Sequence, residues 1–463
     1  MELAGAKMQI IETDAEGNET VVESWESGKN GEKVHVVKGL ATGVEYTLRE
    51  TVAPDGYKVK ADSKFIIDTD GTVKVGGKAV ADNHILVKDD LTEVEVSKVD
   101  ITNMQPIAGV SLKITDTDGN TVEMWDKTKK EWVDAEWTSA ATPQKIFGLK
   151  TGTTYKLVEV APPAGYKKAS ATEFKLKKDG TIDTASTTTP MNDGVLLVED
   201  KPIVDVEVKK AWDDEDDKFG IRPKSVTVKL LADGNYTGKT LVLKEDASDP
   251  AKSWTGKFEG LDMCKYDEGT KAWIPIDYTV DEVNVPDGYV RTVTVTEDIQ
   301  KPGDTKKIKI KNSLNLGDLD IKKNLDNFYL GDGDKIKKTV FAFKVEGFFG
   351  TDDQGKDKKI FETMIGIKFD GKGSKTETLK DLPVGTKIVV TEVYSGVAYQ
   401  GETVSKNTRI VKAGPGEDPA KVEFSNKYND NHEQSGITNR FEKDKNDGSY
   451  NVKGNKSKSS IDN

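Results

Sequence analysis

Apolar and polar residues alternate with a period of two over most of the chain, and this alternation predicts short β-strands. In segments such as 94–98 and 155–159, apolar residues occupy alternate positions, so one face of each strand suits a buried core. Turn pairs such as Asp118-Gly119 and Asp179-Gly180 separate the segments, as hairpin turns do. Helical periodicity is hard to find. The pattern therefore predicts an all-β protein.

One segment recurs four times and combines a glutamate-bearing strand with a turn and a tyrosine. The copies cover residues 46–57, 155–166, 278–289 and, more weakly, 388–399. Their glutamates recur every 109 to 123 residues, which is the size of one β-sandwich domain. The recurring glutamates are Glu50, Glu159, Glu282 and Glu392.

The repeat predicts four sandwich modules followed by a polar segment. We place module 1 at 1–92, module 2 at 93–203, module 3 at 204–315, module 4 at 316–428 and a polar tail or spacer at 429–463. The junctions are short and regular, so we expect the sandwiches to form a rod. The tail is rich in Asn, Asp, Lys, Ser and Gly, which predicts disorder, although residues 436–441 could be a strand remnant.

The first strand of three modules carries a lysine in phase with its apolar residues. Lys98 shares a strand face with Val94 and Val96, for example. Burial of an ammonium group is costly, so this placement is unusual. The three lysines are Lys98, Lys210 and Lys323. The neighbouring Lys209 and Lys322 fall on the opposite strand face.

The last predicted strand of each module ends with a carboxyl or carboxamide group. These residues are Asp89, Asp200, Asn312 and Asn426. If the Lys, the Glu and the Asp or Asn of one module meet inside the sandwich, desolvation lowers the pKa of the lysine and raises that of the glutamate. The neutral amine can then attack the side-chain carbonyl while the glutamate relays a proton. Loss of water or ammonia would leave a Lys–Asp or Lys–Asn isopeptide bond.

Such a reaction would happen once per molecule, so we expect no enzyme that turns over a substrate. A single Lys, Glu or Asn at a strand end is usually solvated, and that is the simpler interpretation of any one site. The same order of residues in three modules favours a cross-link in at least one of them.

The net charge and the cysteine count narrow the functional classes. A charge of −12 offers no basic face for nucleic acid and disfavours anionic lipid. The single cysteine, Cys264, cannot form an intrachain disulfide, so a small secreted β-sandwich would need a different kind of stabilising cross-link. No signal peptide and no apolar run long enough to span a membrane is visible. These features favour an interior piece of a longer protein, or a protein trimmed at both ends.

Other chemistries find little support in the sequence. The histidines His35, His84 and His432 lie far apart, which disfavours a hydrolase or zinc site. Residues 213–217 could bind calcium, but their spacing differs from an EF-hand loop, and we favour a solvated loop. Three tryptophans in an insertion at 124–142 could form a ligand patch, although packing over the sandwich edge is the simpler interpretation. We expect no cofactor and no metal.

These motifs resemble the collagen-adhesin B-type and SpaA-type domains of Gram-positive surface proteins and pilins. The resemblance extends over residues 1–428 and is strongest in modules 1 and 2, through segments 2–6, 50–57 and 84–89. Module 3 is similar through 210–214, and module 4 is similar more loosely. The resemblance implies Ig-like or prealbumin-like β-sandwiches.

The resemblance also implies roles for the site residues and a location for the protein. The lysines would be amine donors, the glutamates proton relays, and the Asp and Asn residues acceptors. The chain would be a structural stalk or adhesin region outside the cell, held to the cell wall through regions beyond these residues. Alternatively, the sandwich faces would bind a host extracellular matrix protein or a glycan directly.

Module 1 departs from the pattern because its lysine strand is missing. Counting back from Gly5, as from Gly109 to Lys98 in module 2, leads to a position before Met1. Lys7 belongs to the next strand. Module 1 therefore either does not close a bond here or accepts a strand from another chain, and we favour simple truncation.

Overall fold

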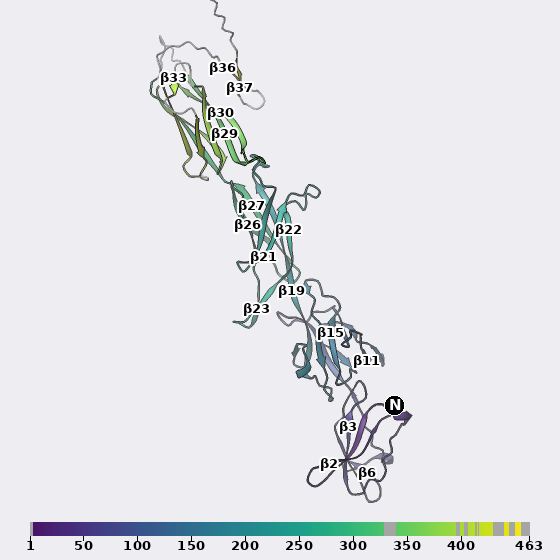
Figure 1. Ribbon diagram of the computed structural model, residues 1–463. Helices are drawn as coiled ribbons and strands as arrows, with labels where there is room; N and C mark the ends of the chain where they lie inside the picture. Colours follow the sequence, from purple (N-terminus) through teal and green to yellow (C-terminus); the bar gives the residue numbers. More distant parts are fainter. Residues whose placement is uncertain are drawn as a thin grey trace, which may run out of the picture. The chain divides into compact units, whose positions relative to one another are not determined.

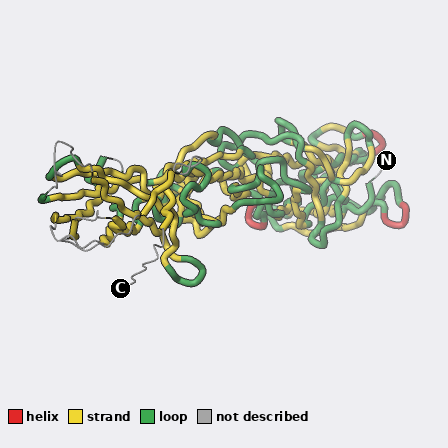
Figure 2. Tube along the Cα trace, turned by 90° about the horizontal axis from the view of Figure 1, so that it is seen from above, coloured by secondary structure: helices red, strands yellow, loops and turns green. Residues whose placement is uncertain are grey.

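The computed structural model describes residues 3–327, 339–394, 399–401, 406–412, 414, 416–428, 439–443 and 450–454. Nearly all regular structure in these residues is β-strand, as the colours of Figure 2 show. The only helical segments in them are the 3-10 turns Lys29–Gly31, Ala81–Asn83 and Thr184–Ser186. None of these could cross a membrane. The predicted all-β class is confirmed.

Contacts within the chain divide it into two compact units. Unit 1 contains residues 1–205, 259–276 and 299–305, and unit 2 contains residues 206–258, 277–298 and 306–463. Modules 1 and 2 lie in unit 1, module 4 lies in unit 2, and module 3 contributes residues to both. The four module boundaries themselves remain a prediction.

Module 1 is built on one sheet with the strand order β2-β1-β3-β5-β6-β7, of which β2, β3 and β6 are labelled in Figure 1. Its strands are β1 (Lys7–Thr13), β2 (Glu19–Glu26), β3 (Glu45–Val52), β4 (Tyr57–Lys58), β5 (Ser63–Ile67), β6 (Val73–Val75), β7 (Lys78–Ala79) and β8 (Asp90–Leu91). Inward residues such as Ile10, Leu48 and Phe65 form its core. Strand β3 places Glu50 beside Met8 of β1.

Module 2 forms a second core in unit 1. Its strands are β9 (Glu93–Asp100), β10 (Ser111–Thr115), β11 (Glu123–Asp126), β12 (Glu131–Asp134), β13 (Glu136–Thr138), β14 (Gln144–Phe147), β15 (Thr154–Glu159), β16 (Tyr166–Lys167), β17 (Thr172–Lys175), β18 (Met191–Asn192) and the start of β19 (Val195–Asp213). One layer has the order β13-β10-β15-β17, and the other contains β14-β9-β19. Leu112, Leu157 and Phe174 are buried between them. The first strand, β9, runs parallel to the last, β19.

The third module continues from β19. Its further strands are β20 (Ser225–Ala232), β21 (Asn235–Lys244), β22 (Thr255–Asp262), β23 (Cys264–Asp267), β24 (Ala272–Pro275), β25 (Tyr278–Glu282), β26 (Tyr289–Glu297) and β27 (Thr305–Leu314). Unit 2 contains its sheet β21-β20-β25 and the pairing of β19 with β27. Val206 and Val208 on β19 are fully buried, as the alternation predicts.

Module 4 consists of two four-stranded sheets, β31-β28-β35-β33 and β30-β29-β32-β34. Its strands are β28 (Leu316–Leu325), β29 (Thr339–Thr351), β30 (Asp357–Phe369), β31 (Gly373–Pro383), β32 (Lys387–Tyr394), β33 (Tyr399–Gly401), β34 (Lys406–Ile410) and β35 (Ala420–Tyr428). Its first strand, β28, also runs parallel to its last, β35. Of the tail, β36 (Asn439–Lys443) and β37 (Tyr450–Gly454) form a hairpin. The disorder expected for the rest of 429–463 falls outside the described residues.

One predicted strand is absent. Residues 85–89, which should close module 1, have no strand structure, and only β8 follows them to pair with β4. The corresponding strands of modules 2 and 4 pair with the lysine strand. No lysine strand exists in the described part of module 1, so the closing segment has no neighbour to pair with. The alternation was present, but a strand also needs a partner.

Candidate functional site

The side chains predicted to react come together in modules 2, 3 and 4. In each module the lysine and the Asp or Asn are buried, and the glutamate lies next to the lysine. Glu159 and Glu282 are buried as well, and Glu392 is partly buried. The strand register explains this meeting in modules 2 and 4. Lys98 lies opposite Val198, two residues before Asp200, and Lys323 lies opposite Phe424, two residues before Asn426. A step of two returns to the same strand face, so donor and acceptor share it.

In module 2 the amine and the acceptor are in direct contact. The Nζ atom of Lys98 contacts Oδ1 of Asp200 and lies 3.5 Å from Oε1 of Glu159, and all three side chains are fully buried. The backbone N–H of Ala169 donates to Oε2 of Glu159 at 2.6 Å, which leaves Oε1 facing the lysine and the aspartate. Burial raises the pKa of Asp200 to about 6, although Lys98 opposes this change.

In module 3 the glutamate lies between the other two groups. Oε2 of Glu282 is 3.8 Å from Nζ of Lys210, and Oε1 accepts a hydrogen bond of 3.2 Å from Nδ2 of Asn312. Burial lowers the pKa of Lys210 to about 8 and raises the pKa of Glu282. The ammonium also lies 4.3 Å from the centre of the Trp212 ring. Both shifts favour a neutral amine beside a protonated acid.

Module 4 repeats the arrangement. Oε1 of Glu392 is 2.8 Å from Nζ of Lys323 and accepts a hydrogen bond of 2.9 Å from Nδ2 of Asn426. Burial lowers the pKa of Lys323, which lies against the rings of Phe341 and Phe343. The rival lysines point elsewhere, as strand parity predicted: Lys209 is exposed, and Lys322 pairs with Glu423.

Module 1 has the relay and the acceptor without an amine between them. Glu50 is buried, and the backbone N–H of Lys60 donates to its Oε2 at 2.6 Å, just as Ala169 does for Glu159. Oε1 of Glu50 and Oδ1 of Asp89 are buried and have no hydrogen-bond partner among the described residues. Burial raises the pKa of both groups, and the charge of Asp89 adds to the effect on Glu50.

Sequence reasoning missed a buried ion pair that adjoins the module 3 site. The guanidinium of Arg222 donates to both oxygens of Asp214, at 2.9 and 2.5 Å, and the hydroxyl of Tyr289 donates to Oδ2 at 3.0 Å. Trp212 stacks edge-on against Tyr289. Asp214 lies in the segment considered for calcium, so this carboxylate is held by an arginine. The described residues contain no group of three or more His, Cys, Asp or Glu side chains that could hold a metal ion.

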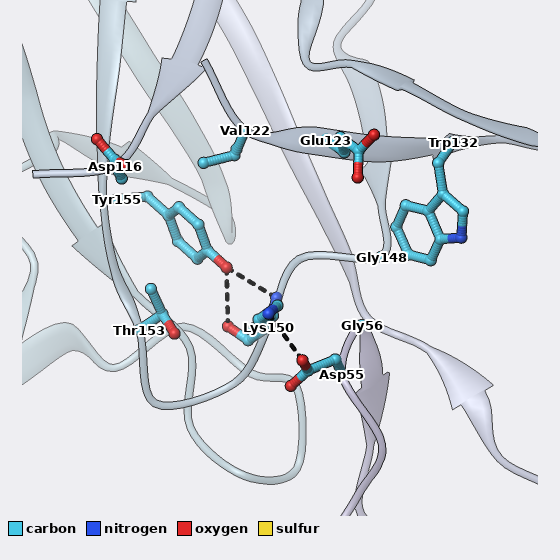
Figure 3. Close-up of a pocket in the computed structure, with 10 residues that line it drawn as sticks. All are labelled: Asp55, Gly56, Asp116, Val122, Glu123, Trp132, Gly148, Lys150, Thr153 and Tyr155. Carbon is cyan, nitrogen blue, oxygen red and sulfur yellow. Dashed lines mark hydrogen bonds and ion pairs between the residues drawn. The ribbon is translucent and has the colours of Figure 1, made fainter. Parts of the chain in front are cut away.

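A pocket of about 530 Å³ lies in unit 1 where residues of modules 1 and 2 meet (Figure 3). Lys150 pairs with Asp55 at 2.7 Å across it, and the backbone N–H of Lys150 donates to the hydroxyl of Tyr155. The Trp132 ring covers the backbone of Gly56 and Gly148, where a Cβ atom would collide with it. The packing interpretation therefore fits Trp132 better than a free ligand patch.

Comparisons with known proteins agree with the fold. Residues 206–311 match the family model of the Cna protein B-type domain, and residues 1–79 and 92–190 match that of the SpaA prealbumin-like fold domain. Residues 319–429 match a domain of unknown function, DUF5979. These matches confirm the resemblance: the chain carries tandem domains of the B-type and prealbumin-like kinds found in bacterial surface proteins.

Individual relatives are more distant. The collagen adhesin of Staphylococcus aureus is 28% identical over 284 residues, which cover 60% of this chain and 21% of the adhesin, so the chain spans about a fifth of that relative. The TIE protein of Bacillus anthracis is 14% identical with a TM-score of 0.32, over 92% of this chain and 69% of that structure. Two B repeat units of the collagen-binding protein of S. aureus are 17% identical with a TM-score of 0.20, over 92% and 94%.

Proposed function

We propose that modules 2, 3 and 4 each form an isopeptide bond between their first and last strands, and that the chain is a stalk region of a bacterial surface protein stabilised by these bonds. The bonds would join Lys98 to Asp200, Lys210 to Asn312 and Lys323 to Asn426. The observation that carries the proposal is the meeting of a buried lysine, a buried acceptor and a glutamate at the same place in three modules.

The reaction needs a neutral amine and a polarised carbonyl. The lone pair of the lysine Nζ attacks Cγ of the acceptor, and the protonated glutamate donates to the acceptor oxygen. In modules 3 and 4, a half-turn of the amide brings Oδ1 to the glutamate in place of Nδ2. The glutamate then passes the amine proton to the leaving group. An amide forms with loss of water from Asp200 or of ammonia from Asn312 and Asn426.

Burial favours the products. A buried ammonium and a buried carboxyl are costly even when they are paired, whereas the amide carries no charge. Fixed proximity replaces a bimolecular encounter, and effective molarities of roughly 10⁵ M or more are known for well-oriented groups. Side chains such as Lys98 and Asp200 are fully buried, so bulk solvent has no access to the new bond, which disfavours its hydrolysis.

The position of each bond suits a stalk. In modules 2 and 4 the donor strand and the acceptor strand are parallel neighbours, and they are also the first and last strands of the module. Tension applied along the chain would therefore pass through the amide, and the sandwich could not unzip. The bond would also restrict the unfolded chain, which for a loop of about 100 residues contributes about 4.7 kcal/mol by analogy with disulfides.

A surface location follows from the domain families, as part of the same proposal. The protein would act outside the cell, attached to the cell wall through regions beyond this chain. The collagen adhesin relative raises the alternative of direct binding to a host matrix protein. That alternative rests on the relative's name, whereas the stalk rests on three buried sites.

Digestion of the purified chain followed by tandem mass spectrometry tests the proposal bond by bond. We expect three branched peptides that join Lys98, Lys210 and Lys323 to their acceptors. Lys209 and Lys322 serve as internal controls, because they lie on the other strand face and should appear only in linear peptides. Linear peptides throughout would refute the cross-links.

A further inference from the structure

A second buried carboxyl group lies opposite the acceptor of module 2. Asp100 follows Lys98 by two residues on β9, and the parallel register places it opposite Asp200 on β19. The backbone N–H of Ile101 donates to the carbonyl oxygen of Asp200 at 3.0 Å, which holds the two strands together at this point. Asp100 is 3% exposed and Asp200 is fully buried. The module therefore has two buried carboxyl groups at facing positions, and the proposed reaction consumes only one of them.

The two carboxyl groups have opposite surroundings. Oδ1 of Asp100 accepts from the backbone N–H of Thr102 at 2.8 Å and from its hydroxyl at 2.6 Å, and Oδ2 accepts from the hydroxyl of Tyr166 at 3.0 Å. Neither carboxyl oxygen of Asp200 has a hydrogen-bond partner in the described residues, although Oδ1 contacts Nζ of Lys98. Three donors suit an ionised carboxylate, whereas buried oxygens without donors suit the protonated acid. In such a pair one group keeps its charge and the other keeps a proton.

Several other titratable groups lie around this pair, namely Lys98, Glu159, Tyr166, Lys201 and Cys264. Burial raises the pKa of Tyr166 to about 12, and its hydrogen bond to Asp100 and the charges of Asp100 and Asp200 add to this effect. Burial also raises the pKa of the Cys264 thiol, with a further contribution from Asp100 that Lys201 opposes. The phenol and the thiol are therefore neutral near pH 7, and the phenol remains a donor to Asp100.

The residue at this position differs with the chemistry of the acceptor. Leu325 lies opposite the acceptor of module 4, and Trp212 has the equivalent place in module 3, two residues after Lys210. Both of these modules use an asparagine acceptor, whose amide is neutral without an added proton. Asp200, in contrast, can be attacked by an amine only while it is protonated. Among the three modules with a complete trio, a carboxyl group follows the lysine by two residues only where the acceptor must keep a proton.

We propose that Asp100 is a positioning residue for bond formation in module 2, where its fixed negative charge keeps Asp200 protonated and therefore open to attack. A buried charge disfavours a second ionisation of the same sign beside it. Nζ of Lys98 then bonds to Cγ of Asp200, and the bond from Cγ to the hydroxyl breaks. The hydroxyl leaves as water with an amine proton relayed by Glu159, and Asp100 is unchanged. This inference rests on the cross-link proposed above for module 2.

Refolding of the full chain at different pH values tests this role. Chains recovered in urea without the bond are diluted into buffers from pH 5 to 8, quenched at intervals and digested, and the branched Lys98–Asp200 peptide is quantified by mass spectrometry. In the wild type the rate should fall as the pH rises past about 6, where Asp200 titrates. In Asp100→Asn the same fall should occur about one pH unit lower, so the bond should form about tenfold more slowly at pH 7.

Asp100 also caps the turn that follows β9, so the test must separate its charge from this structural role. Asparagine at this position keeps an oxygen for the backbone N–H of Thr102, and the branched peptide of module 3 in the same digest reports on folding of the rest of the chain. Asp126→Asn is the matched control, because Asp126 caps another turn of module 2 through backbone N–H groups two and three residues further on. It should leave the pH profile of module 2 unchanged.

Replacement of the acceptor gives a second measurement. In Asp200→Asn the acceptor has no proton to lose, so the addition of Asp100→Asn should change the rate at pH 7 by less than about twofold. Tyr166→Phe removes one donor from the Asp100 carboxylate. It should move the wild-type profile in the same direction as Asp100→Asn, by a smaller amount.

A pH profile that keeps its position in Asp100→Asn would overturn the inference, whether or not all rates fall together. An equal loss of rate with the aspartate and the asparagine acceptor would overturn it too, because a structural role affects both. A wild-type chain without the Lys98–Asp200 bond would refute the proposed function in module 2 and the inference with it. A bonded wild type with an unmoved variant profile would overturn the inference alone.

Discussion

The substitution Glu159→Gln should leave module 2 folded but unbonded. Glutamine keeps an oxygen that can accept from the backbone N–H of Ala169, so the local geometry survives. It cannot donate an acidic proton to Asp200 or relay one from Lys98. The buried Lys98–Asp200 ion pair then persists without the amide. The mass should therefore lack the loss of one water that the wild type shows.

The expected effect on stability follows from the loop that the bond closes. A loop of about 100 residues constrained by a cross-link contributes about 4.7 kcal/mol through the entropy of the unfolded chain. A module of about 110 residues has an unfolding entropy of roughly 0.23 kcal/mol/K, so its Tm should fall by about 20 °C. Differential scanning calorimetry measures this change, and intact-mass spectrometry of the same sample measures the bond.

Glu199→Gln is the matched control, because Glu199 neighbours Asp200 on β19 but lies on the other strand face and is half-buried. It should change neither the water loss nor the transition of module 2 by more than a few degrees. If Glu159→Gln retains the water loss, Glu159 is not the relay. If the bond is lost and the Tm is unchanged, the chain-entropy argument is wrong.

Two further predictions concern module 3. In the unbonded variant Asn312→Ala, Lys210 keeps a pKa that burial lowers from 10.5 to about 8. Between these two pH values the unfolded chain binds more protons than the folded chain, so the free energy of unfolding should rise with pH. Urea midpoints measured from pH 8 to 10 check this, and a wild-type profile with the same slope would contradict it, since an amide does not titrate. Arg222→Ala should destabilise the module by about 3 kcal/mol, because Asp214 would keep a buried charge without its partner. Its ammonia loss should be retained, and Lys218→Ala in the same loop, at an exposed side chain, should be nearly neutral in the same denaturation assay.

Strand periodicity was sufficient to predict which side chains are buried. Val94, Val96 and Lys98 share the inner face of β9, and Tyr155, Leu157 and Glu159 share that of β15. A period of two fixes the face of every residue once a strand forms. This is why the buried lysines, and the choice of Lys210 over Lys209, could be derived from the sequence alone.

Pairing between distant segments could not be derived in the same way. Residues 85–89 have the alternation of a strand but form none, because a strand requires a neighbour and module 1 lacks one in the described residues. The Asp214–Arg222 pair also depends on how a loop returns to β19. Its sequence signal was the single arginine near an acidic run, which solvated loops share. The local sequence pattern determines which face of a strand a side chain occupies. Which strand or side chain it pairs with is set by the tertiary fold.

The most direct test of the cross-linked stalk is the intact mass of the purified chain. We expect a mass below that of the sequence by one water and two ammonias, from Asp200, Asn312 and Asn426. A mass equal to that of the sequence would contradict the proposal in all three modules and leave only the fold.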